Sequence, residues 1–131
     1  MKFMRKIGVL MMAFSVAVCG GQTSLAKTAT YNNKTVTYTY EMGMVPYGSV
    51  NYLEVCTAKM TYPVSISMKI DGTITAKKNG RTYTMSDYTS KNTDWLTKNF
   101  AFDTPGYDIT HFLGKYTIDK QKTYKIDTVI N

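Results

Sequence analysis

Beyond its first 26 residues the sequence contains one thiol and one imidazole, Cys56 and His111. A cysteine nucleophile needs a lowered pKa, an accessible position and a base within hydrogen-bond reach. Cys56 follows Leu53 and Val55 in an apolar stretch without a glycine-rich turn, which is typical of a buried cysteine that packs as a small apolar side chain. His111 has no second histidine or cysteine at ligand spacing, so we expect a strand-surface histidine and no zinc site.

A pair of carboxylates, Asp103 and Asp108, flanks the turn residues Pro105 and Gly106. Two carboxylates on one loop are ligands that calcium takes together with backbone oxygens. Aspartates in turns also accept hydrogen bonds from nearby backbone N–H groups, and we favour this second interpretation. Hydrolysis by a carboxylate pair depends on a separation that the sequence does not set. Because no P-loop, dinucleotide, nucleophile-elbow or zinc-protease motif is present, we expect no catalytic activity, cofactor or metal.

Surface residues are the remaining candidates for binding. They comprise three aromatic residues near predicted loops and three cations around a predicted hairpin turn, namely Trp95, Tyr88, Tyr107, Lys77, Lys78 and Arg81. Exposed aromatic rings stack on sugars or anchor a protein partner, whereas a cationic hairpin can contact an anionic polymer or lipid headgroups. Each group also has a structural interpretation, because Trp95 can pack over the end of the core and charged hairpins block edge-to-edge aggregation.

The first 26 residues have the order of features of a secretory signal peptide. Three cations within residues 1–6 precede an uncharged apolar run, 7–18, and Ser24-Leu25-Ala26 is a small-x-small cleavage site. The run is shorter than the roughly 20 residues that span a bilayer. We therefore expect cleavage after Ala26, a secreted extracellular product and no transmembrane segment.

Cys19, at the end of the apolar run, provides an alternative in which the protein is anchored by a lipid on this cysteine. Val18 precedes it, where a lipoprotein signal has a small residue, so we favour secretion. Once the first 26 residues are removed, Cys56 is the only cysteine left. The fold must then be stable without an internal disulfide.

The charge balance is modestly basic. The whole chain carries a net charge of +7, and removing the three cations of residues 1–26 leaves +4. The charges are scattered, as on an ordinary soluble surface, although a small positive excess also suits an anionic cell wall or membrane. Nucleic acid is not an expected partner, because the chain has no basic–aromatic recognition motif.

Alternating apolar and polar residues predict strands throughout the chain. After a short leader, 27–33, the pattern indicates about eight strands within 35–42, 50–60, 64–70, 73–77, 81–86, 95–102, 112–118 and 124–130. Asp71-Gly72 and Asn79-Gly80 are favoured two-residue hairpin turns, which predict a three-stranded meander over 64–86. Pro63 marks a boundary, and a bulge near Glu54 is expected to turn its carboxylate outward.

These patterns predict one all-β domain over residues 27–131. The expected architecture is a small antiparallel β-sandwich of the immunoglobulin-like kind, and the alternative is a small closed β-barrel. We expect a non-catalytic binding module at or outside the cell envelope, with a cell-wall polymer, a glycan or a protein as its partner. A bacteriocin-like or toxin-like secreted effector is the alternative function.

Overall fold

The computed structural model describes residues 23–130, which form antiparallel strands joined by turns, with no helix among them. The predicted all-β class is confirmed. The strands are β1 (Ser24–Tyr31), β2 (Lys34–Tyr47), β3 (Asn51–Lys78), β4 (Arg81–Phe100), β5 (Asp108–Ile118) and β6 (Lys122–Val129).

All six strands belong to one sheet in which β3 is the shared strand. The order is β1-β2-β3-β5-β6, and β4 lies along the other edge of β3. The beginning of β3 pairs with β2 and with the end of β4, whereas the rest of β3 pairs with β5 and with the beginning of β4. We call these two parts the first half and the second half of the sheet.

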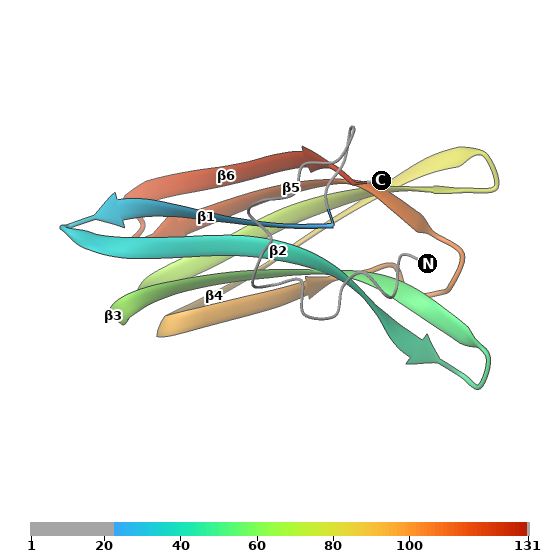
Figure 1. Cartoon of the computed structure of the whole chain (residues 1–131), viewed down its shortest axis with the longest axis horizontal. Coiled ribbons are helices and arrows are strands. Elements are labelled where there is room, and N and C mark those ends of the chain that lie inside the picture. Colours follow the sequence, from blue (N-terminus) through green and yellow to red (C-terminus); the bar gives the residue numbers. More distant parts are fainter. Residues whose placement is uncertain (1–22, 131) are drawn as a thin grey trace.

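β3 bends sharply where the two halves meet. The register with β4 shifts between Thr61 and Ile66, a stretch that contains Pro63, which has no N–H to donate to a ladder. β4 bends beside it, where the hydroxyl of Thr93 accepts a hydrogen bond from the backbone N–H of Trp95 at 3.2 Å. Figure 1 shows the result, since β3 runs to one end of the molecule and returns, which curls the sheet into a half-barrel.

The predicted immunoglobulin-like sandwich of two separate sheets is not confirmed. One continuous sheet covers its own apolar face, because strands that bend can continue from one layer into the other. A closed barrel, which was the alternative, does not form either, because none of the ladders within residues 23–130 joins β1 to β6. The physical requirement behind both predictions, a covered apolar face, is met by curling.

Of the two predicted hairpin turns, only one forms. Asn79 and Gly80 connect β3 to β4 with φ angles of 53° and 78°, as a two-residue turn of this type requires. The prediction for Asp71-Gly72 was wrong, because both residues lie inside β3. Gly72 serves close packing, since a Cβ there would lie 2.4 Å from the Phe100 ring. Residues 64–86, predicted as a three-stranded meander, therefore belong to only two long strands, β3 and β4.

The remaining tight turns also place non-glycine residues at positive φ, namely Asn32, Asn33, Asp119 and Lys120. The second pair lies between the predicted strands 112–118 and 124–130, where the structure has the turn from β5 to β6. The first pair shows that the predicted leader, 27–33, belongs to the β1–β2 hairpin.

Most of the predicted signal peptide, including Cys19, lies outside the described residues. Its predicted cleavage site, 24–26, lies in β1 and pairs with β2. Cleavage after Ala26 would leave residues 27–31 of β1 in the sheet.

Aromatic rings fill the space between the two halves. Tyr38 of β2 lies 5.2 Å from the Tyr116 ring and 5.3 Å from the Tyr124 ring, measured between centroids. The hydroxyl of Tyr116 donates a hydrogen bond of 2.8 Å to the backbone oxygen of Thr39. Side chains of β5 and β6 thus pack directly on β2, and the inner face of the sheet forms the core.

Candidate functional site

The structure does not bring Cys56 and His111 together as a catalytic pair. The Cys56 side chain is 0% exposed on the inner face, and burial raises its pKa well above the ordinary value. His111 lies on the outer face, where its Nε2 is 2.5 Å from Oδ1 of Asp127 on β6. A buried thiol held in its protonated form and a histidine on the opposite face form no nucleophile–base pair.

Asp103 and Asp108 are both exposed, the first in the β4–β5 loop and the second at the start of β5. Asp108 pairs with Lys77 in the β3–β5 ladder. Across residues 23–130, no group of three or more histidine, cysteine, aspartate or glutamate side chains is arranged to hold a metal ion. The two aspartates are therefore not part of a recognisable metal site.

Glu54 was predicted to turn outward through a bulge, and this prediction was wrong. The β2–β3 ladder continues through Glu54 without a register shift, so the carboxylate stays in the inward phase. Its Oε1 accepts a hydrogen bond of 2.8 Å from the backbone N–H of Ile109. The irregularity lies instead in the β3–β5 ladder, at Thr75 and Ala76. Glu54 thus connects the starts of β3 and β5.

Tyr107 and Lys78, two of the predicted binding residues, do lie together. The Lys78 Nζ is 4.4 Å from the centroid of the Tyr107 ring, a cation–π geometry. The same ring stacks on Phe102 at 4.2 Å and meets Tyr83 edge-on at 5.4 Å. Tyr107 is thereby held in a small aromatic cluster, and Lys78 covers it. Lys77 and Arg81 remain exposed beside the hairpin turn.

Tyr88 and Trp95 lie on β4 with 59% and 53% of their surfaces exposed. Tyr88 pairs with Asp71 and Trp95 with Thr61, on either side of the bend in β3. Seven residues of extended chain separate them by roughly 20 Å. Tyr107 is elsewhere, in the aromatic cluster, so the three predicted aromatic residues do not form one patch.

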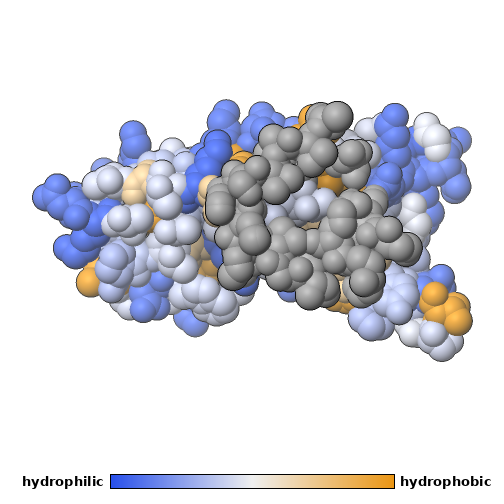
Figure 2. All heavy atoms as spheres, in the orientation of Figure 1, coloured by the Kyte–Doolittle hydropathy of each residue, from blue (hydrophilic) through white to orange (hydrophobic). Residues whose placement is uncertain are grey.

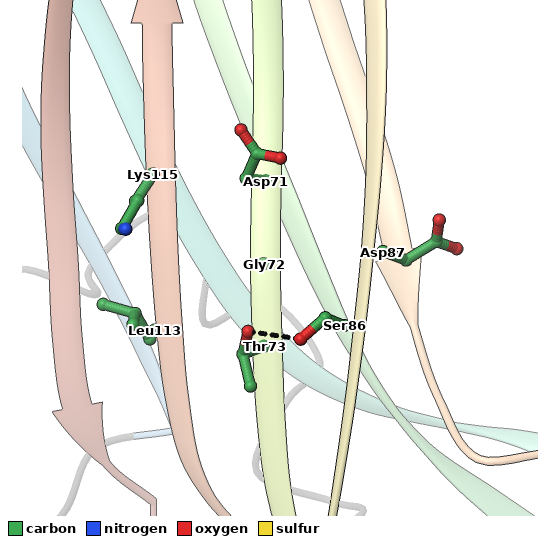
Figure 3. A pocket seen from close by; sticks show the side chains of 7 residues that line it. All are labelled: Asp71, Gly72, Thr73, Ser86, Asp87, Leu113 and Lys115. Carbon is green, nitrogen blue, oxygen red and sulfur yellow. Dashed lines mark hydrogen bonds between the residues drawn. The ribbon is translucent and has the colours of Figure 1, made fainter.

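Two polar hollows flank Tyr88 on the outer face of the second half. One, of about 330 Å³, is drawn in Figure 3 and is lined by Asp71, Gly72, Thr73, Ser86, Asp87, Leu113 and Lys115. The other, of about 430 Å³, is lined by Ser67, Lys69, Ser90, Lys91, Asn92, Thr117 and Lys120.

The ladder registers place Tyr88 at the border between the two hollows. Tyr88, Asp71 and Lys115 form one row across β4, β3 and β5, and the next row contains Lys69. The Lys69 Nζ lies 5.1 Å from the centroid of the Tyr88 ring and 3.7 Å from Asp71 Oδ2. An exposed ring with cations, a carboxylate and hydroxyls around it offers a stacking surface together with hydrogen-bond donors and acceptors.

The backbone beside Tyr88 is fixed by charged groups. Asp87 Oδ1 accepts a hydrogen bond of 2.8 Å from the Tyr88 N–H, and Asp87 Oδ2 pairs with Lys98 Nζ at 2.8 Å. The Lys98 ammonium and then this backbone N–H hold the pKa of Asp87 below its usual value. In the first hollow the hydroxyls of Thr73 and Ser86 are hydrogen-bonded to each other at 2.7 Å (Figure 3).

A second exposed surface, which the sequence did not predict, lies at the tip of the β2–β3 hairpin. Val45, Tyr47, Val50 and Tyr52 are all exposed there, and Val50 is 79% exposed. Figure 2 shows hydrophobic atoms at this tip, on the lower right of the molecule. A sequence signal existed, because residues 42–58 include a single charged residue, Glu54, but alternating apolar residues predict burial.

Comparison with known proteins gives no family for this chain: no family model matches it, and no curated protein matches it in sequence. Within residues 23–130, the structure has no helix of the length and hydropathy needed to cross a membrane.

Proposed function

We propose that this chain is an exported, non-catalytic binding module that holds a hydroxyl-rich polymer, a glycan, on the outer face around Tyr88. The observation that carries the proposal is the position of this exposed ring at the border of two polar hollows. Aromatic rings stack on the apolar faces of sugars, and neighbouring polar groups orient the hydroxyls. In this proposal the Tyr88 ring stacks on a sugar ring, and the polar groups that line the hollows hydrogen-bond the sugar hydroxyls.

The shape of this surface supports an extended ligand. Ser67 and Thr73 line different hollows on the same strand, and extended chain between them spans roughly 20 Å. A polymer lying along β3 would contact both hollows and pass over the Tyr88 ring. Cations and a carboxylate are neighbours on this surface, since Lys69 precedes Asp71 on the same face of β3 and Lys115 of β5 pairs with Asp71. This mixture of charges suits neutral hydroxyls better than a strongly anionic chain.

A location at or outside the cell envelope is part of the proposal. Its support is the signal-peptide pattern of residues 1–26 and the small positive charge of the remaining chain. Lipid anchoring through Cys19 is the alternative location. The absence of catalysis is supported by the burial of Cys56, the separate position of His111 and the exposure of both loop aspartates.

Retention on immobilised cell-wall polysaccharides and on a glycan array tests the proposal. Tyr88→Ala should weaken retention about tenfold or more, because it removes the stacking of the ring, worth ~0.5–1.5 kcal/mol, together with the apolar area that the ring would bury. Trp95→Ala is the matched control, since it removes an equally exposed ring on the same strand, away from the hollows. Equal retention of the two variants, with both folded, would refute binding at Tyr88.

A further inference from the structure

Two hairpins of different character project from the same end of the molecule. In Figure 1, the β2–β3 hairpin and the β3–β4 hairpin both extend to the right, past the loop between β4 and β5. The bend in β3 explains this, because its first and last residues return to the same end. We call this the hairpin end, made of residues 45–52 and 77–81.

The β2–β3 hairpin presents apolar side chains, and residues 42–53 of its own sequence include no charged residue. Val50 forms its tip, Val45 and Tyr52 follow, and Tyr47 pairs with Asn51. The nearest charged residue in the hairpin is Glu54, and its carboxylate is hydrogen-bonded to the Ile109 N–H rather than placed at the tip. Such an exposed apolar protrusion on a small protein indicates an interaction site.

The β3–β4 hairpin presents cations at the same end. Lys77 and Arg81 are exposed on either side of the Asn79-Gly80 turn, and Lys78 lies against Tyr107. Asp108 is beside Lys77 in the ladder, so Arg81 is the cation farthest from this carboxylate. Asp103, in the β4–β5 loop, is set back because the hairpins extend past that loop (Figure 1).

We infer that the hairpin end docks on an anionic lipid bilayer, with the β2–β3 hairpin in the interface and the cations of the β3–β4 hairpin on the headgroups. A bilayer fits these observations because it is flat enough to meet both projecting hairpins at once. From Val45 to Val50 the hairpin extends roughly 10 Å, close to the ~5–10 Å that interfacial segments penetrate. Tyr47 and Tyr52 then lie at headgroup level, where tyrosine is favoured.

The charge pattern favours lipid over a protein partner or a second copy. Anionic headgroups attract basic residues near the surface, while apolar side chains enter the acyl boundary. The hairpin end offers these two chemistries on separate protrusions. This inference is independent of polymer binding, because Tyr88 lies on the outer face of the sheet and not at the hairpin end.

Sedimentation with vesicles tests the inference, using phosphatidylcholine alone or mixed equally with phosphatidylglycerol. The purified chain should bind the mixed vesicles and lose binding as salt rises. Val50→Asp should weaken binding about tenfold or more, because it puts a carboxylate in place of an apolar group that the bilayer interface would bury. Its matched control is Val64→Asp, at an exposed valine in the bend of β3 at the other end, which should bind as the unaltered chain does.

The double variant Lys77→Gln/Arg81→Gln should also weaken binding about tenfold or more. Lys34→Gln/Lys122→Gln changes the net charge equally at the opposite end of the molecule and should have little effect. Val50→Trp should retain binding, and its fluorescence should shift to shorter wavelength on the mixed vesicles.

Three outcomes would overturn the inference. Equal weakening by the two double variants would indicate non-specific charge attraction, and unchanged binding of Val50→Asp would exclude insertion of the hairpin. A change of oligomeric state in Val50→Asp without an effect on vesicles would assign the hairpin to a second copy. Tyr88→Ala should not alter vesicle binding, so failure of polymer binding and failure of membrane docking are distinguishable.

Discussion

Tyrosines at the two ends of this molecule have opposite environments. At the end opposite the hairpin end, which we call the turn end, Tyr31 donates a hydrogen bond of 2.6 Å to Asp119 Oδ2 and Tyr62 donates one of 2.7 Å to the Tyr31 backbone oxygen. At the hairpin end, Tyr47 and Tyr52 are exposed on a projecting hairpin. Both pairs belong to strands, so strand formation alone does not decide burial. What differs is whether the facing half of the sheet lies opposite.

This comparison explains why the binding surfaces lie where they do. Where the halves converge, aromatic rings and their hydroxyls are used for packing and hydrogen bonds. Where they diverge, apolar side chains remain on the surface and are available to a partner. Substitutions in the two regions should therefore differ in their effect on stability.

Gly72→Ala should cause the largest loss of stability. A Cβ at this position would lie 2.4 Å from the Phe100 ring, which comes from the other half of the sheet. Overpacking of this kind costs about 1–3 kcal/mol or more. Gly43→Ala is the control, because nothing lies within 4 Å of a Cβ there. Urea unfolding of the two variants measures the difference, and similar midpoints would contradict the close packing of the halves.

Tyr116→Phe should have the next largest effect. The substitution leaves the Thr39 backbone oxygen without the hydroxyl that donates to it at 2.8 Å. Loss of such a bond in the interior costs about 1–2 kcal/mol in the free energy of unfolding. Tyr47→Phe removes a hydroxyl from the exposed hairpin and should change stability little. If both substitutions had the same effect in urea, the contrast between the two regions would be wrong.

Alkaline pH should destabilise the packed region first. The hydrogen bond to Asp119 raises the pKa of Tyr31 to about 12 from its ordinary value of 10.0, and burial raises the pKa of Tyr38 and of Tyr116. A raised folded-state pKa gives stability that is complete below pH 10 and is lost as pH rises towards the folded value, because the unfolded chain releases its protons first.

Thermal unfolding followed between pH 9 and pH 12 measures this loss. Tyr31→Phe should reduce the slope with pH, since one shifted phenol is removed. A melting temperature that does not change across this pH range would contradict the raised pKa values of these tyrosines in the folded protein.

Val50→Ser should have the smallest effect on folding. Val50 is 79% exposed, and surface substitutions away from special features usually change stability by within about 0.5 kcal/mol. The melting temperature in the absence of lipid measures this. A clear loss would mean that the hairpin tip packs against the rest of the molecule instead of projecting from it.

The all-β class could be predicted from the sequence because alternation and turn residues act locally. Asn79 and Gly80 indicate their hairpin through their own tolerance of positive φ. Asp71-Gly72 has the same local appearance, yet Gly72 is required by the ring of Phe100 on a distant strand. The alternating pattern indicates that each strand has an apolar face that must be covered. It does not indicate whether two sheets or one curled sheet will cover it.

The candidate surfaces were harder to predict, because exposure depends on the facing half. Tyr88 was selected as an aromatic near a loop, but it lies within β4, and only the ladder register places it at the border of the hollows. Glu54 has a hydrogen-bond partner, the Ile109 N–H, that only the tertiary fold brings near. The apolar tip around Val50 was missed because strand-like alternation predicts a buried residue whether or not a strand faces it.

The shared strand β3 has a consequence for how the molecule opens. Because residues 51–61 and 66–78 of one strand pair into both halves, neither half can detach while the other stays intact. Local opening events will begin at β1 and β6, which each pair with one neighbour over eight residues. β4 also has a single neighbour in the described sheet, but it pairs with β3 along both 56–61 and 66–78. The amide protons of β3 should then exchange with deuterated solvent only through global unfolding, as a single cooperative unit.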